Sequence, residues 1–285
     1  MFANPPLDCL RAAVVLYVLG FAYALLATLL GREHNRPVFF GLIIAGFAAQ
    51  SAGLYLRGVQ THYFPVTNTF ELLQALTWVT VFLQLILRAT LGLRLLGLFA
   101  SGLAAVLSLA SLLLPGADLP PMVVAGGDGN PWIGFHVALA LFSYGVFGLL
   151  AVTALMYLLQ RHGLEQKRFG GIFRLLPSLA ELDALNRQLL LIGVWALTFA
   201  VAIGVLDWFR QPGGVSAVKL TVVAAVWAGY LMVGWLRARH RLVAGAYAWA
   251  CLLLFAFAMF SLWPVSQSLP SPAPVGSFPK TLTHS

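Results

Sequence analysis

The sequence is poor in charged residues and in cysteine, and each shortage excludes a broad class of protein. Charged residues make up only 9% of the 285 residues, whereas hydrophobic residues make up 60%. A water-soluble domain of this composition would have to expose an implausibly large apolar surface. The two cysteines, Cys9 and Cys251, lie near opposite ends of the chain and form no Cys-x-x-Cys pair, so we expect no thiol–disulfide chemistry.

The sequence also lacks the common catalytic and nucleotide-binding motifs. It contains no Walker loop, no dinucleotide glycine fingerprint, no catalytic triad pattern and no cluster of Cys and His at metal-binding spacing. The net charge of +8 does not indicate nucleic acid, because the basic residues lie in short loops rather than on a stripe interleaved with aromatic residues. We therefore expect no independent catalytic activity and no nucleic-acid partner.

What the sequence does contain is a series of apolar runs, each close to the roughly 20 residues that a helix needs to cross a bilayer. Lipid cannot satisfy backbone polar groups and the alternating pattern of a barrel is absent, so every run is predicted to be a helix. The sequence thus predicts an all-α integral membrane protein, a polytopic bundle of about eight transmembrane helices. The runs are Leu10–Leu30, Val38–Leu56, Thr69–Leu87, Leu91–Leu114, Trp132–Leu159, Leu189–Phe209, Val218–Leu236 and Leu242–Trp263.

Basic residues divide unequally between the two sides of the membrane that these runs define. Of the 17 Lys and Arg residues, twelve lie after spans one, three, five and seven, and five lie on the other side. Cationic loops stay in the cytoplasm because they resist translocation, so both termini are predicted to lie outside the cell inner (plasma) membrane. The five residues on the outer side are Arg11, Arg57, Arg210, Lys219 and Lys280.

Three segments outside these runs are longer than the other connections. Pro115–Pro131, on the outer side, is rich in Gly and Pro and could cover a cavity. Arg161–Gln188, on the cytoplasmic side, is predicted to form one amphipathic helix on the inner leaflet. The tail after Pro264 is rich in Pro, Ser and Thr, which indicates disorder. We therefore expect a transmembrane domain over residues 1–264 and a disordered tail over residues 265–285.

The N-terminus has no basic segment ahead of its first apolar run and no clear signal-peptidase site. We expect the first span to be retained, with the mature chain starting near Met1.

His136 lies about one turn into the fifth span, on the outer side, and follows Trp132. An ionisable group at this depth should face a cavity or a partner rather than lipid. Two interpretations stay open. The imidazole could hydrogen-bond a neighbouring helix or reach the outer interface, or it could serve as a neutral axial ligand of haem iron.

Polar residues at two other span ends on the outer side are further candidates. Asn68 and Glu71 open the third span with the spacing of a helix start, in which Asn68 caps the helix and Glu71 reaches back. Alternatively, Glu71 and Asn68 could hold a haem propionate through water or orient a histidine. Asp207 and Trp208 end the sixth span, where Trp208 is either an interfacial anchor or an aromatic shelf for a flat ligand.

Several stretches match one family in their order and sidedness along almost the whole chain. They are Leu176–Gly193 with its continuation to Gly204, Pro65–Glu71 through Trp78, Trp132–His136 through Tyr144, and Lys219–Thr221 with Trp227, Tyr230 and Arg237. Together they resemble the cytochrome c assembly family of CcsA-type, haem-handling membrane proteins, and most closely its HemX-like and YpjD-like members that lack a tryptophan-rich motif.

This resemblance implies that His136 is an outward-facing haem ligand, with Trp132 and Trp208 flanking the macrocycle. The chain departs from the family in three places. The loop between Asp207 and Lys219 lacks the motif Trp-Gly-x-x-Trp-x-Trp-Asp, the second outer histidine expected near Phe260–Val265 is missing, and Trp235 stands where an intramembrane histidine would fall.

We therefore expect a membrane protein of cytochrome c or haem biogenesis that handles haem at the outer face. Because part of the family's haem platform is missing, it should act as an accessory or with a partner, such as a maturation subunit or an apocytochrome. Two alternatives stay open: a small-molecule transporter, and a membrane scaffold whose Arg161–Gln188 segment docks and regulates an enzyme of haem synthesis.

The predicted orientation can be tested with single cysteines introduced into a Cys-free background. Asp118→Cys should react with a membrane-impermeant thiol reagent in intact cells, because it lies on the outer side, whereas Lys167→Cys should react only after lysis. Labelling of Lys167→Cys but not of Asp118→Cys in intact cells would reverse the orientation.

Overall fold

The computed structural model describes residues 4–31, 35–61, 66, 68–91, 94–113, 131–167, 176–210 and 217–267, and these residues form helices and short connections with no strand. Each of the eight helices is long and apolar enough to cross a membrane, which confirms the predicted all-α class and all eight spans. In chain order they are α1 (Pro5–Leu29), α2 (Arg36–Thr61), α3 (Thr69–Leu91), α4 (Arg94–Leu113), α5 (Pro131–Glu165), α6 (Leu179–Arg210), α7 (Ala217–Ala238) and α8 (Ala244–Gln267).

Two helix starts are set by polar caps that the sequence encodes. The predicted cap of α3 is confirmed, since the Glu71 amide donates to Asn68 Oδ1 over 2.8 Å. At the start of α6 the caps are reciprocal: the Glu181 amide donates to Ser178 Oγ over 3.3 Å, and the Ser178 amide donates to Glu181 Oε2 over 3.0 Å. Such capping boxes satisfy backbone donors that have no partner within the helix.

The predicted single amphipathic helix over Arg161–Gln188 is wrong. Its first residues continue α5 to Glu165, and its last residues belong to α6. The physical reason lies at both junctions: Lys167 adopts a left-handed conformation with φ of 54°, and the Ser178 cap starts a new helix.

Several predicted segments lie outside the described residues. These are most of Pro115–Pro131, residues 168–175, and the tail from residue 268 onward. Helix α8 runs to Gln267, and the stretch of it that is apolar enough to cross a membrane is Ala244–Leu262. The domain boundary at residue 264 stays a prediction.

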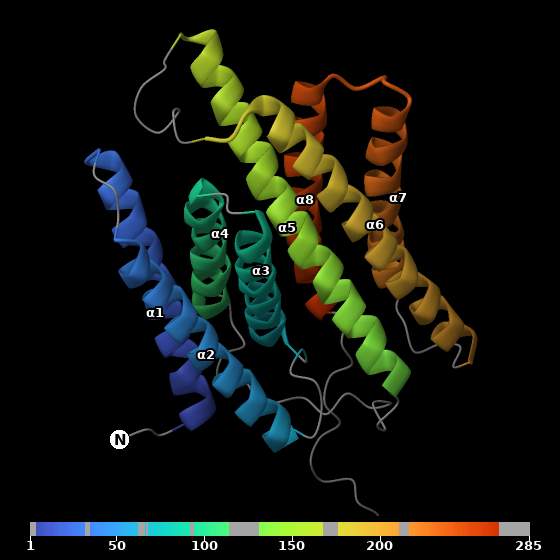
Figure 1. Ribbon diagram of the computed structural model, residues 1–285. Helices are drawn as coiled ribbons and strands as arrows, with labels where there is room; N and C mark the ends of the chain where they lie inside the picture. Colours follow the sequence, from blue (N-terminus) through green and yellow to red (C-terminus); the bar gives the residue numbers. More distant parts are fainter. Residues whose placement is uncertain are drawn as a thin grey trace, which may run out of the picture.

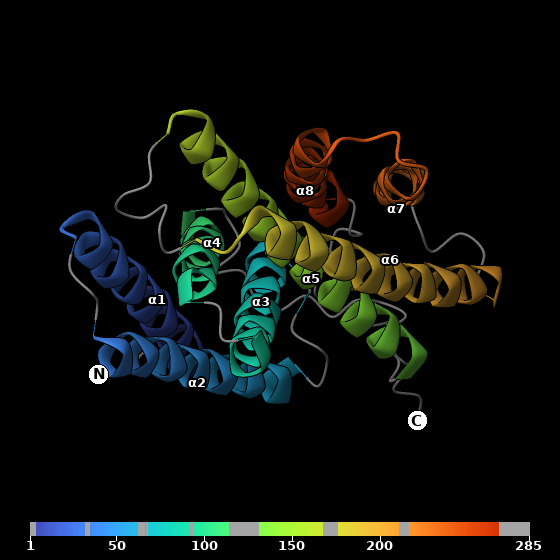
Figure 2. The same cartoon turned by 45° about the horizontal axis from the view of Figure 1, so that its top comes forward.

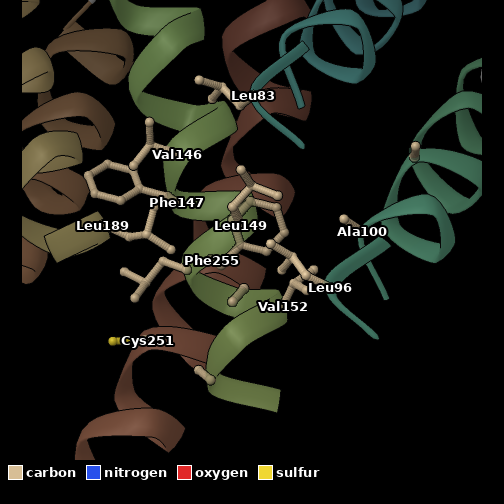
Figure 3. Close-up of a cluster of buried hydrophobic side chains, with 14 of the residues drawn as sticks. Leu83, Leu96, Ala100, Val146, Phe147, Leu149, Val152, Leu189, Cys251 and Phe255 are labelled. Carbon is tan, nitrogen blue, oxygen red and sulfur yellow. The ribbon is translucent and has the colours of Figure 1, made fainter. Parts of the chain in front are cut away.

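Helix α5 occupies the centre of the bundle (Figures 1 and 2). It packs against α3 and α4 on one side and against α6 and α8 on the other, while α1 pairs with α2 and also contacts α4. Figure 3 shows buried side chains from α3, α4, α6 and α8, among them Leu83, Leu96, Leu189 and Phe255, meeting side chains of α5 such as Phe147. The hydrophobic core therefore forms around one helix.

Glycine brings α5 and α6 into close contact. A Cβ atom at Gly193 of α6 would overlap the ring of Phe147 of α5. That ring has little room to move, because it stacks on Tyr230 of α7 with 3.7 Å between centroids and an interplanar angle of 5°. Small residues at such crossings let helix backbones approach closely in lipid.

A chain of buried hydrogen bonds joins α1, α2, α3 and α4. The Tyr17 hydroxyl donates to Gln50 Oε1 over 2.8 Å, and Gln50 Nε2 donates to Gln74 Oε1 over 2.7 Å. Gln74 Nε2 then donates to Ser111 Oγ over 2.9 Å. All four side chains are fully buried, so the links replace water that a bilayer interior cannot supply.

At the opposite side of the bundle, polar links join α6 to its neighbours. The Tyr247 hydroxyl of α8 donates to the Asn186 carbonyl over 3.0 Å, and Thr153 of α5 contacts Asn186 Oδ1 at 2.5 Å. Arg237 of α7 binds both carboxylate oxygens of Asp183, each over 2.7 Å. Together these contacts connect the beginning of α6 to α5, to α8 and to the end of α7.

Candidate functional site

His136 lies near the start of α5 and faces α6. Its Nδ1 lies 2.7 Å from the carbonyl oxygen of Ala200. A carbonyl oxygen only accepts, so Nδ1 must carry the proton and donate it. In the neutral imidazole, Nε2 then keeps its lone pair, which is the form of histidine that ligates metals.

The ring of His136 rests on a glycine of α6. A Cβ atom at Gly204 would lie 2.8 Å from Cε1 and 3.1 Å from Nδ1 of the imidazole. Any larger residue at this position would displace the ring and weaken its bond to Ala200. Ala200 and Gly204 are one turn apart, so a single stripe of α6 both orients the imidazole and leaves space for it.

Helix geometry extends this site outward to two tryptophans. Trp132 precedes His136 by four residues in α5, and Trp208 follows Gly204 by four residues in α6, so each lies on the same helix face one turn farther out. Trp132 is 57% exposed, and Trp208 is half-buried beside Phe209. Asp207 lies next to Trp208 in the last turn of α6. Four of the six predicted residues therefore lie at the same end of the α5–α6 pair, in the first turns of α5 and the last turns of α6.

The other two predicted residues lie elsewhere. Asn68 and Glu71 begin α3, and Glu71 is fully buried and forms an ion pair with Arg57 of α2, which is also buried. The Arg57 guanidinium lies 5.9 Å from the centre of the Phe70 ring. In both overall views the first turns of α3 and α5 diverge (Figures 1 and 2). The structure therefore places Glu71 and Asn68 in the α2–α3 packing and not beside His136.

Sequence reasoning missed the role of Arg57, which it assigned to an outer loop. Helix α2 instead continues to Thr61 and carries Arg57 inside the bundle. The spacing of Gln50, Gly53 and Arg57 at i, i+3 and i+7 would have placed Arg57 on the face that meets other helices. A buried charge in a membrane is expected to have a partner, and Glu71 opens the next helix on the same side.

The positions where the chain departs from the family carry no replacement ligand in the described part of the structure. Phe260 of α8 is 82% exposed and faces away from the bundle. Trp235 lies in the half of α7 remote from His136, and the loop over residues 211–216 lies outside the described residues. No group of three or more His, Cys, Asp and Glu side chains that could hold a metal ion occurs among the residues that were placed.

Comparison with known proteins identifies the family of the chain. The family model for cytochrome c assembly protein matches residues 66–269, a range that starts just before α3 and includes the whole α5–α6 site. The chain belongs to the cytochrome c assembly protein family. The predicted resemblance is therefore confirmed.

Proteins named HemX and proteins named CcsA are among the similar relatives. Protein HemX of Brevibacillus brevis is 31% identical over 214 residues, which cover 74% of this chain and 76% of the relative. Protein HemX of Bacillus subtilis is 26% identical over 269 residues, covering 90% and 95%. The cytochrome c biogenesis protein CcsA of Trichodesmium erythraeum is 29% identical over 174 residues, which cover 60% of this chain but 47% of the relative.

The buried ion pair of Arg57 and Glu71 gives a prediction about stability. Glu71→Gln should destabilise the protein by about 3–5 kcal/mol, because it leaves a buried guanidinium without its countercharge. The double variant Arg57→Met with Glu71→Leu should lose less stability than Glu71→Gln alone, because it leaves no unpaired charge buried. Thermal unfolding of the purified protein in detergent measures both effects.

A matched control is the exposed pair of Arg161 and Glu165, which are 2.7 Å apart and about half-exposed. Glu165→Gln should change stability by no more than about 1 kcal/mol. Equal losses of stability in Glu71→Gln and Glu165→Gln would show that the Arg57–Glu71 pair contributes no more to stability than an exposed ion pair does.

Proposed function

We propose that this protein acts in cytochrome c biogenesis by handling haem at the outer ends of α5 and α6, as an accessory or together with a partner. A role in cytochrome c biogenesis is supported by the family and by the relatives named CcsA. The observation that carries the finer proposal is the hydrogen bond from His136 Nδ1 to the Ala200 carbonyl. It leaves Nε2 as a ligand with its orientation fixed by α6.

The residues present fit one side of a haem. His136 would supply one axial nitrogen, and Trp132 and Trp208 would flank the macrocycle from the next turn outward. Haem bound there would supply an iron centre whose redox potential depends on its axial ligands and their hydrogen bonds. The chain's own contribution is to hold the imidazole in one tautomer and orientation, through Ala200 and Gly204.

A single ligand explains why we expect a partner. Among the described residues the other histidines are His162 and His240, and both lie at the opposite end of the bundle from His136. Any further ligand to the iron would then have to come from water or from another protein. We infer that binding by this chain alone is weak, and that an apocytochrome or a maturation subunit completes the site.

The two alternative functions have less support. A transporter of the type with broken helices would interrupt its spans near the middle of the membrane, whereas each of the eight helices is continuous between its described ends. A scaffold would use Arg161–Gln188, whose two ends belong to α5 and α6 and so do not form the one amphipathic helix expected for docking. Haem handling at the α5–α6 site is the function that the geometry favours.

Haem binding can be tested by visible spectroscopy. Purified wild-type protein titrated with haem should develop the shifted Soret band of ligated haem, and His136→Ala should diminish this band because the nitrogen ligand is lost. Added imidazole should restore the band by entering the vacated position. His162→Ala, which removes a histidine from the far end of the same helix, should leave the spectrum unchanged. An unaltered band in His136→Ala would remove this residue from the site.

The accessory role makes a separate prediction about cells. In a host whose CcsA-type protein has been deleted, this chain alone should not restore cytochromes c, because one histidine cannot hold haem firmly toward incoming thiols. Covalent haem staining of membrane proteins after denaturing electrophoresis measures the outcome. Restored staining by this chain alone would show that it is a complete ligase.

A further inference from the structure

A groove of about 690 Å³ runs between α6 and α7, on the half of the bundle remote from His136. Its apolar walls include Leu190, Val194 and Trp195 from α6, and Leu231 and Trp235 from α7. Volumes of about 300–1,000 Å³ are typical of sites for small molecules. Trp195 is 61% exposed and Trp235 is 52% exposed, so the groove opens toward the membrane.

Two features create the groove: α6 and α7 are not parallel, and α7 carries a glycine, Gly234, where it faces α6. In Figure 2, α7 is seen nearly end-on while α6 lies across the view. Where the helices face each other, a Cβ atom at Gly234 would meet only Leu190 Cδ2, at 3.5 Å. This is ordinary van der Waals contact, so the two helices are not tightly packed at Gly234 and a space remains between them.

One end of the groove carries a concentration of positive charge. Arg187 and Arg237 line it directly. Arg239 and Arg241 follow the end of α7, with guanidinium carbons 5.7 and 5.9 Å from the centre of the Trp235 ring. The carboxylates nearby on α6 are those of Asp183, which binds Arg237 and also lies 3.7 Å from Nε of Arg187, and Glu181, which binds the Ser178 amide. Four arginines therefore outnumber two carboxylates.

We propose that this groove binds an anionic phospholipid, with one acyl chain between α6 and α7 at Gly234 and the phosphate beside Arg187 and Arg241. An apolar slot that ends in arginines complements a molecule with an apolar chain and an anionic head, and basic pockets between transmembrane helices recognise such head groups. The predicted orientation puts the head group in the cytoplasmic leaflet. Neither the groove nor its charge depends on haem binding at His136.

The test uses the full chain, purified and reconstituted with equal amounts of dioleoyl phosphatidylglycerol and dioleoyl phosphatidylcholine. Native mass spectrometry should find phosphatidylglycerol retained in preference to phosphatidylcholine. Arg187→Gln should weaken its retention about fivefold, as expected for one basic residue near an anionic head group. Arg210→Gln, which removes the same charge from the other end of α6, should have no effect.

A second pair of variants tests the apolar part of the site. Gly234→Leu should displace the acyl chain and reduce retention while leaving every charge in place, whereas Gly234→Ala should behave like the wild type. The proposal is overturned if the two lipids are retained equally, if Arg210→Gln acts as strongly as Arg187→Gln, or if a folded Gly234→Leu protein retains phosphatidylglycerol unchanged. The last two results would indicate general attraction to a basic protein and not a built site.

Discussion

The close packing of α5 against α6 is the contact on which the rest of the structure depends. Helices in a bilayer gain little hydrophobic free energy by associating, because lipid tails are as apolar as leucine. Close van der Waals contact must hold them, and Gly193 permits it by admitting the ring of Phe147. The same contact sets how far the two helices are shifted along each other, and this shift brings His136 opposite Ala200 and Gly204.

Helix α6 therefore links two regions with different chemistry. Its C-terminal half orients the imidazole of His136, and its N-terminal half forms one wall of the groove that is lined by Arg187 and Arg237 at one end. The helix is continuous over 32 residues, a length of about 48 Å.

The eight spans could be predicted from the sequence because length and hydropathy alone define a membrane-crossing helix. The packing could not, since a lipid-facing side and a core-facing side are both apolar and periodicity does not separate them. Arg57 and Glu71 illustrate the difficulty, because each looks like a helix-end residue until the two helices are placed side by side. Polarity at that depth is rare, so the sequence could single out His136 as facing a neighbouring helix or a ligand. Its partner could not be predicted, because the Ala200 carbonyl belongs to the backbone and leaves no trace in the sequence.

The hydrogen bonds from Tyr17 through Gln50 and Gln74 to Ser111 have a consequence for the membrane as an electrical barrier. Each carboxamide in this chain accepts through oxygen and donates through nitrogen, and its nitrogen gives up no proton at ordinary pH. A proton therefore cannot pass along it from donor to acceptor, as it can along a file of water or carboxylic acids. The four helices are joined by polar groups deep in the bilayer, yet this connection offers no leak for a proton gradient.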